Sequence, residues 1–330
     1  MNSMVDSPSD AVRYQYLDVY LAPLVPFLEQ PDITDIFINQ PGELWIERLG
    51  QEPVRHEMPS LNDEMLWRLA RQIANLTHQG ISREHPLLAA TLPDGSRIQI
   101  VAPPATRGSI AIAIRKHVVA DFTLGDYEKG GAFASTQTIT AASDRAPSLK
   151  SETKDVRAAL REAVITRRNI IISGGTATGK TTFLNALLKE VPANERLILI
   201  EDTPEIRVSH ANAVGLVGIK GRLGEASVTP DDLLQASLRM RPDRIILGEL
   251  RGAEAYTFLR AINTGHPGSM TTLHADSPHG AIEQLALIVL QSGVQLRRTD
   301  IVDYVRSVVG LIVQLDRHEG ARRVSQLWVP

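Results

Sequence analysis

The chain contains no cysteine, and this absence excludes several classes of protein. A disulfide-stabilised scaffold and the common cysteine-based zinc sites are both ruled out. No apolar run approaches the roughly 18 residues that a membrane-spanning helix needs, and the polar, acidic start MNSMVDSPSD has no hydrophobic core of a signal peptide. We therefore expect a soluble, intracellular protein, long enough at 330 residues to form two domains.

A strong excess of positive charge is also missing. Residues 1–133 hold 11 basic and 17 acidic side chains, whereas the remainder holds 24 basic and 21 acidic ones. Neither part has the positive field typical of proteins that bind nucleic acid or anionic membranes. We expect no direct, specific binding of nucleic acid, although a small local basic patch is compatible with these counts.

The first part of the chain, residues 1–130, has the pattern of a small mixed α/β domain. Strand-like runs at DITDIFIN and ELWIER are separated by the turn NQPG. A helix follows over NDEMLWRLARQIANLTHQ, with Asn62 as its N-cap, and then a strand pair around LPDG, formed by RIQIVAP and SIAIAIRKH. Residues 131–154, rich in Ser, Thr and Ala, are predicted to be a flexible linker, in which a short helix would be no surprise.

Residues 155–330 alternate between helix and strand, which is typical of a parallel sheet covered on both faces. The strands are NIIIS, RLILIED, RIILGEL and SMTTLH, and residues 310–329 resemble a hairpin. One helix begins at TPDDLLQ, where Thr229 is a suitable N-cap and Pro230 occupies the first helical position. The fold class is therefore α/β.

The stretch GGTATGKTT matches the phosphate-binding loop pattern G-x-x-x-x-G-K-[ST] and lies between a predicted strand and a predicted helix. Backbone N–H groups of such a loop and the N-terminus of its helix surround phosphates, the lysine reaches the β- and γ-phosphates, and the hydroxyl after it binds magnesium. We therefore predict ATP and Mg²⁺ as ligands. The predicted nucleotide-binding residues are Gly174, Gly175, Thr176, Ala177, Thr178, Gly179, Lys180, Thr181 and Thr182.

Three further side chains follow the apolar strands of this region. RLILI is followed by Glu201, RIIL by Gly248 and Glu249, and SMTTL by His274. Ligands of open parallel sheets bind at the carboxyl ends of the strands, so these groups are expected to meet the phosphate loop. Taken singly, each of these side chains has a plainer interpretation: a glutamate at a strand end can be solvated or cap a helix, and a histidine can be structural.

The nearby arginines also have a plain interpretation. Arg239, Arg241 and Arg244 can form a solvated helix end.

Phosphate loops usually come with a strand that ends in aspartate near the magnesium ion, yet Gly248 stands at that position. We predict that Thr181 holds the metal directly and that Glu249 acts on water, directly or within the metal's water shell. Glu201 is the other candidate for this role, and the choice between the two glutamates is open. His274 is predicted to sense or stabilise the γ-phosphate, and Lys180 to bind it.

Charge compensation on the far side of the phosphates needs another cation. Arg115, at the end of SIAIAIRK in the first domain, is the candidate. An ordinary exposed strand-end arginine is an equally good interpretation of this residue.

Four motifs, GGTATGKTT, RLILIEDTPEI, LRMRPDRIILGELRG and TGHPGSMTTLHA, closely resemble the Walker A, Asp-box, Walker B and His-box motifs of bacterial secretion ATPases. The likeness is greatest to the TrbB-like traffic ATPases of type IV secretion and conjugation, and it extends into the first domain through LPDGSRIQIVAPPATRGSIAIAIRK. It implies a RecA-like P-loop NTPase domain behind the smaller N-terminal domain. The family roles fall on Lys180, Thr181, Glu201, Glu249 and His274, and less firmly on Arg115.

This resemblance also implies a homohexameric, Mg-dependent ATPase that powers substrate export or pilus assembly. Such a motor is cytoplasmic and is held at the inner membrane through channel components rather than by direct insertion. Three alternatives are open: a type II secretion or type IV pilus motor, a DNA-stimulated RecA-like translocase, and an inactive nucleotide-gated scaffold. Hydrolysis that ignores single-stranded DNA would remove the second, and turnover sensitive to Glu249→Gln would remove the third.

Overall fold

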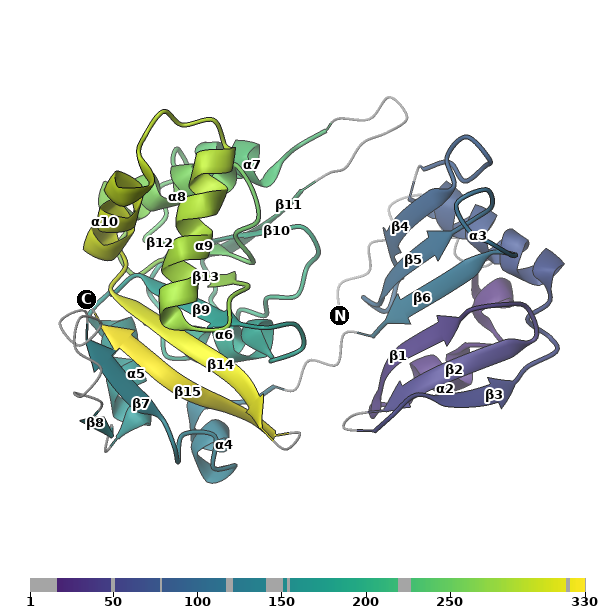
Figure 1. Ribbon diagram of the computed structural model, residues 1–330, viewed down its shortest axis with the longest axis horizontal. Coiled ribbons are helices and arrows are strands. Elements are labelled where there is room, and N and C mark those ends of the chain that lie inside the picture. Colours follow the sequence, from purple (N-terminus) through teal and green to yellow (C-terminus); the bar gives the residue numbers. More distant parts are fainter. Residues whose placement is uncertain are drawn as a thin grey trace. The chain divides into compact units, whose positions relative to one another are not determined.

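The computed structural model describes residues 17–48, 51–77, 79–116, 121–140, 151–152, 155–218, 227–318 and 321–329. These residues divide into two compact units, the first ending at Lys116 and the second starting at Asp121. Both units are mixed α/β, and Figure 1 labels their elements along the chain. Among the described residues, no helix combines the length and apolar character that crossing a bilayer requires.

The first unit is built on a six-stranded sheet with the order β3-β2-β1-β6-β5-β4, in which all neighbours are antiparallel. Its elements are α2 (Val25–Leu28), β1 (Ile33–Ile38), β2 (Glu43–Arg48), β3 (Val54–Glu57), α3 (Asp63–Leu76), β4 (Leu87–Thr91), β5 (Arg97–Val101) and β6 (Ala111–Arg115). The buried side chains of α3 and of the central strands form one apolar core.

The predicted elements of this unit are present. The side chain of Asn62 accepts a hydrogen bond from the backbone N–H of Met65, which fixes the start of α3 as expected of an N-cap. The turn at LPDG differs from the prediction, because it joins β4 to β5 rather than β5 to β6. Strand β4, with the sequence LLAAT, was not predicted.

The second unit contains a nine-stranded sheet with the order β11-β10-β12-β13-β9-β14-β15-β7-β8. From β11 to β14 in this spatial order every strand is parallel to its neighbours, whereas β15 is antiparallel to β14. The strands are β7 (Gln137–Thr140), β8 (Ser151–Glu152), β9 (Ile170–Gly174), β10 (Leu197–Glu201), β11 (Ala213–Val217), β12 (Arg244–Leu247), β13 (Met270–Leu273), β14 (Leu311–His318) and β15 (Ala321–Val329).

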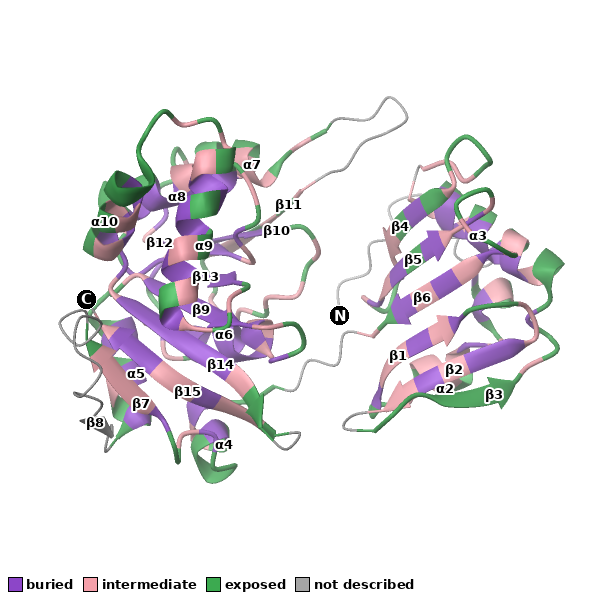
Figure 2. Ribbon diagram, viewed as in Figure 1, coloured by how far each residue is buried: buried purple, intermediate pink, exposed green. Residues whose placement is uncertain are grey.

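Helices cover both faces of this sheet, as the alternating sequence pattern predicts. They are α4 (Leu124–Lys129), α5 (Val156–Ile165), α6 (Lys180–Leu188), α7 (Pro230–Ser237), α8 (Glu254–Asn263), α9 (Pro278–Gln291) and α10 (Arg298–Val308). Side chains alternate along β9, so Ile171 packs with the core of α7 to α10 while Ile170 and Ile172 pack with α4 to α6. Strands β9, β10, β12 and β13 are buried along their whole length (Figure 2).

The boundary between the units falls earlier than the sequence predicts. Residues 121–130 fall in the predicted first domain and residues 131–154 in the predicted linker, yet Tyr127 of α4 packs edge-on against Phe183 of α6, with ring centroids 5.0 Å apart. Strand β7 is paired in parallel with β15. Residues 121–140 are therefore part of the second unit, and the remainder of the predicted linker lies largely outside the described residues.

Arg244 is buried, which contradicts its interpretation as part of a solvated helix end. Its side chain is inaccessible to solvent, and its Nε and Nη2 donate to the two carboxylate oxygens of Glu195 at 2.5 and 3.0 Å. Arg167 lies 3.3 Å from the same carboxylate. This pairing ties the start of β12 to the loop before β10. The N-cap predicted at Thr229 is confirmed, because Thr229 and Asp232 form a capping box at the start of α7.

Candidate nucleotide site

The phosphate loop joins β9 to α6 without any regular structure of its own. Gly179 is the N-cap of α6 and has a φ of +87°, which a residue with a side chain rarely adopts. Gly174 is restricted by space, because a Cβ there would lie 2.6 Å from Oγ1 of Thr178 and 2.8 Å from the carbonyl oxygen of Leu315. The two glycines of the motif are therefore required by backbone conformation and by close packing.

Lys180, the first residue of α6, bends back over the loop. Its Nζ donates to the carbonyl oxygens of Gly174 and Gly175, both at 2.9 Å, and lies 3.2 Å from Nδ1 of His274. Burial lowers the pKa of Lys180, and the nearby carboxylate of Glu249 opposes that shift. The ammonium group is thus held at the mouth of the loop by weak acceptors that phosphate oxygens would outcompete.

Glu249 follows β12 and lies among charged groups. Its Oε2 accepts a hydrogen bond from Nη2 of Arg251. Its Oε1 lies 2.8 Å from Nε2 of His274, but the two groups are not aligned for a hydrogen bond, so this buried oxygen has no hydrogen-bond partner among the described residues. An ionised carboxylate with one unsatisfied buried oxygen is costly unless something else binds it.

His274 follows β13, and its imidazole lies between Lys180 and Glu249. Desolvation lowers its pKa, the charge of Lys180 lowers it further, and the charge of Glu249 acts in the opposite direction. A neutral imidazole can accept a hydrogen bond at one nitrogen and donate one at the other. The loop behind it is fixed because Ser173 and Gln314 both donate to the carbonyl oxygen of Ala275.

Glu201 ends β10 and is used differently. Its Oε1 accepts hydrogen bonds from the backbone N–H groups of Glu205 and Ile206, both at 2.7 Å. The side chain is 7% exposed. This carboxylate therefore orders the loop after β10 and is neither solvated nor a helix cap, the two plainer interpretations that the sequence had left open.

Gly248, the residue in place of the usual aspartate, packs beside Glu201. A Cβ there would meet Cγ of Glu201 at 3.5 Å, an ordinary contact distance, so space alone does not require glycine. The donors present still fit a magnesium–nucleotide complex, which takes one or two protein groups and the substrate's own phosphates. The start of α6, which no side chain caps, and the unsatisfied Oε1 of Glu249 are the observations that support this fit.

Two arginines stand apart from the sequence prediction. Arg251, which was not predicted, connects Glu249 with Asp202, whose Oδ2 lies 4.0 Å from its Nη1. Only its place two residues after Glu249 could have pointed to it. Arg115 lies in the first unit, where its Nε donates to Asp35 at 2.8 Å, so its assignment to the nucleotide site stays a prediction.

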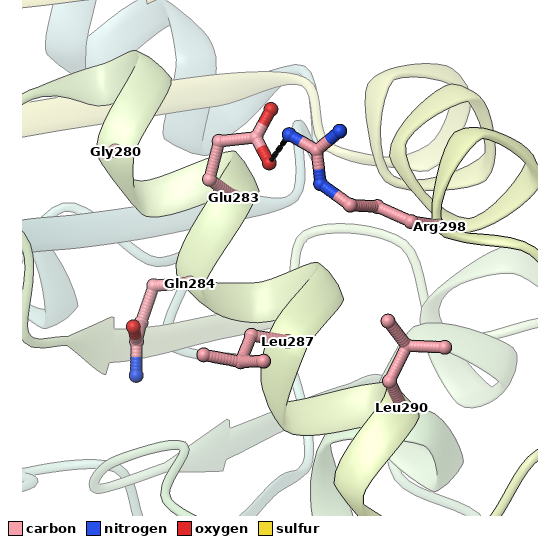
Figure 3. Close-up of a pocket in the computed structure, with 6 residues that line it drawn as sticks. All are labelled: Gly280, Glu283, Gln284, Leu287, Leu290 and Arg298. Carbon is pink, nitrogen blue, oxygen red and sulfur yellow. Dashed lines mark hydrogen bonds and ion pairs between the residues drawn. The ribbon is translucent and has the colours of Figure 1, made fainter.

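A surface hollow of about 280 Å³ lies beside α9 and has no residue in common with the phosphate loop. Figure 3 shows Glu283 and Arg298 paired at one end of it, with Leu287 and Leu290 further along the helix. Gly280 and Gln284 complete its lining. The hollow contains none of the predicted site residues, so the arrangement of charged groups, rather than the shape of the surface, identifies the candidate site.

Known proteins resemble this chain over nearly its whole length. A model of the family described as Type II/IV secretion system protein matches residues 19–324. The type IV secretion system protein VirB11 of Bartonella quintana is 39% identical over 326 residues, which cover 93% of this chain and 91% of the relative. The PtlH homolog of Bordetella bronchiseptica is 37% identical over 331 residues, 96% of each chain.

Solved structures of secretion ATPases also resemble this chain. The VirB11 ATPase from the Brucella suis type IV secretion system, in complex with sulphate, has a TM-score of 0.50 at 37% identity, covering 98% of this chain and 97% of that one. The Legionella pneumophila ATPase DotB, at 18% identity and a TM-score of 0.58, supports the fold alone. The chain therefore belongs to the Type II/IV secretion system protein family and, within it, to the VirB11-like ATPases of type IV secretion systems.

Proposed function

We propose that the protein is a homohexameric, Mg-dependent ATPase that powers substrate export or pilus assembly from the cytoplasmic side of a type IV secretion system. The observation that carries the chemistry is the convergence of Lys180, Glu249 and His274 at the mouth of the phosphate loop. Membership of the VirB11-like group supports the assignment to secretion. The channel subunits that dock it, and through which it associates with the inner membrane, are the proposed partners.

The phosphate loop binds the nucleotide in this proposal. Residues Gly174 to Thr182 supply backbone N–H groups and the positive end of α6 to the phosphates. The Nζ of Lys180 exchanges the two loop carbonyls for oxygens of the β- and γ-phosphates, because an anionic acceptor is stronger than a neutral one. Thr181 contributes its hydroxyl to the metal. Magnesium, when bound, neutralises charge on the β- and γ-phosphate oxygens.

Glu249 is the proposed catalytic carboxylate. Its unsatisfied Oε1 is available to accept a proton from the attacking water or to orient it, while Arg251 holds Oε2 in place. His274 donates or accepts at the γ-phosphate side of the same site. Glu201 is assigned to positioning, because its Oε1 is already used by backbone N–H groups. Arg115 is proposed as the cation supplied by the first unit.

The hexamer can be tested directly with hydrolysis. Size-exclusion fractions of the full chain are assayed for phosphate release from Mg-ATP, with Lys180→Ala as the variant that lacks phosphate binding. We expect turnover to follow the fraction of hexamer mass and to be absent from every Lys180→Ala fraction. Full activity in a monomeric fraction would contradict the ring, and activity unaffected by single-stranded DNA would separate the motor from a DNA translocase.

A further inference from the structure

The C-terminal hairpin, β14 and β15, lies directly beside the strand that leads into the phosphate loop (Figure 1). Leu315 of β14 is paired with Gly174, the first glycine of the motif. On β15, the side chain of Val324 is buried in the core formed with α5 and α6. Because strand side chains alternate, Arg322 faces the same side as Val324 and reaches the loop end of α6.

Arg322 lies across the last glycine of the phosphate loop. A methyl group in place of the hydrogen of Gly179 would lie 3.1 Å from Cδ of Arg322 and 3.3 Å from its Nη1. The charge of Arg322 also acts on the phenol of Tyr127, whose pKa burial raises to about 12. The guanidinium is therefore positioned on the loop itself rather than directed into solvent.

Among the residues that the structure describes, no acidic side chain is paired with Arg322. Among the described residues, no hydrogen bond or ion pair engages its guanidinium, whereas its neighbour Arg323 is paired with Asp316 at 2.6 Å. A cation at the N-terminal end of a helix is disfavoured by the helix dipole. An anion bound at that end reverses the balance, and the planar guanidinium is well suited to phosphate.

We infer that Arg322 is a further nucleotide-binding residue, which donates to a phosphate oxygen of the bound nucleotide from the side of the C-terminal hairpin. The inference rests on the proposed function, because it places the residue at the same phosphate site. It adds a cation from β15 to a site whose other residues in the second unit lie between 174 and 274. The nucleotide then contacts β15 as well as the phosphate loop.

The experiment is a calorimetric titration of the full chain with ADP. Arg322→Gln removes the charge, and Arg322→Lys retains it. Arg317→Gln is the matched control. It removes the same charge from an exposed residue, and Arg317 is the partner of Arg322 across the hairpin. We expect the Kd for ADP to rise about tenfold in Arg322→Gln, the effect of losing one charge-assisted hydrogen bond. Arg322→Lys should recover part of this loss, and Arg317→Gln should match the parent chain.

Two further readouts separate binding from structure. The KM for ATP should rise with the Kd while kcat stays within about twofold, since the contact is made equally in the ground and transition states. The melting temperature without nucleotide should be unchanged in Arg322→Gln. Equal ADP affinity in parent and Arg322→Gln would overturn the inference alone. Loss of affinity that Arg322→Lys reproduces in full, with a lowered melting temperature, would also overturn it. A parent chain that binds no ADP would overturn the proposed function as well.

Discussion

Glu201 is the last residue of β10, Glu249 lies two residues after the end of the neighbouring strand β12, and the two carboxylates are used in opposite ways. Glu201 accepts two backbone N–H groups and stabilises the loop that follows it. Glu249 lies against the side chains of Arg251 and His274, and its Oε1 has no hydrogen-bond partner among the described residues. A carboxylate satisfied by backbone is part of the scaffold, whereas one left partly unsatisfied is available for a ligand. The comparison favours Glu249 as the residue that acts on water.

The largest expected effect is on Glu249. Glu249→Gln should lower kcat by about 100-fold or more, the contribution typical of a general base, while the Kd for ATP changes by only a few-fold because the phosphate loop is intact. The measurement is single-turnover phosphate release beside equilibrium binding. Glu162→Gln, an exposed substitution of the same kind on α5, is the control. Unchanged turnover in Glu249→Gln would remove the proposed chemistry.

Glu201 should respond to the same substitution in a different way. Glu201→Gln keeps an acceptor oxygen for Glu205 and Ile206, so we expect kcat to fall by less than about tenfold. Glu201→Ala leaves both of these half-buried backbone N–H groups without their acceptor, at about 1–3 kcal/mol each in the free energy of unfolding. Urea denaturation measures this loss. If Glu201→Gln abolished turnover as Glu249→Gln is expected to do, the distinction between the roles of the two glutamates would be wrong.

Arg251 sharpens the comparison, because it acts through Glu249. Arg251→Gln releases Oε2 of that carboxylate, and we expect kcat to fall roughly fivefold, which corresponds to about 1 kcal/mol, the net contribution of a typical hydrogen bond. A double-mutant cycle gives the readout. Arg251→Gln should have no further effect when Glu249→Gln is already present; full additivity of the two losses would show that Arg251 acts elsewhere.

The smallest effect is the titration of His274. Burial and the charge of Lys180 lower its pKa, so the NMR midpoint should lie below the ordinary value of about 6.5. Lys180→Met should raise this midpoint by a fraction of a unit, and Lys189→Met should leave it unchanged. Because the folded chain binds this proton less readily than the unfolded chain, stability should decrease as pH falls through the lowered pKa. A midpoint unaffected by Lys180→Met would show that the charge of Lys180 does not act on His274.

Much of the second unit followed from its sequence because apolar strands and glycine motifs are strong local signals. The order of β10, β12, β13 and β9 in the sheet brings Glu201, Glu249, His274 and the phosphate loop to one edge, as expected for parallel strands. The separate roles of the two glutamates did not follow, since the hydrogen bonds of Glu201 depend on how the chain turns after β10.

Other features depend on tertiary structure that no local pattern reveals. Glu254, for example, accepts hydrogen bonds from the backbone N–H groups of Arg251 and Gly252 and so stabilises the turn in which Arg251 meets Glu249. Strand β7, with the polar sequence QTIT, has no hydrophobic alternation. It pairs with β15, which is far from it in the sequence, and local periodicity cannot reveal such a pairing. The buried pair of Arg244 and Glu195 likewise joins residues far apart in sequence.

The pairing of β7 with β15 determines where the chain can be divided. A fragment beginning at residue 155 would leave β15 as an open edge and would uncover Phe183, which Tyr127 contacts. Exposed strand edges invite association with other chains. A fragment beginning at residue 121 keeps α4 and β7, and with them the outer boundary of the sheet. We therefore expect a fragment that begins at residue 121 to aggregate less than one that begins at residue 155.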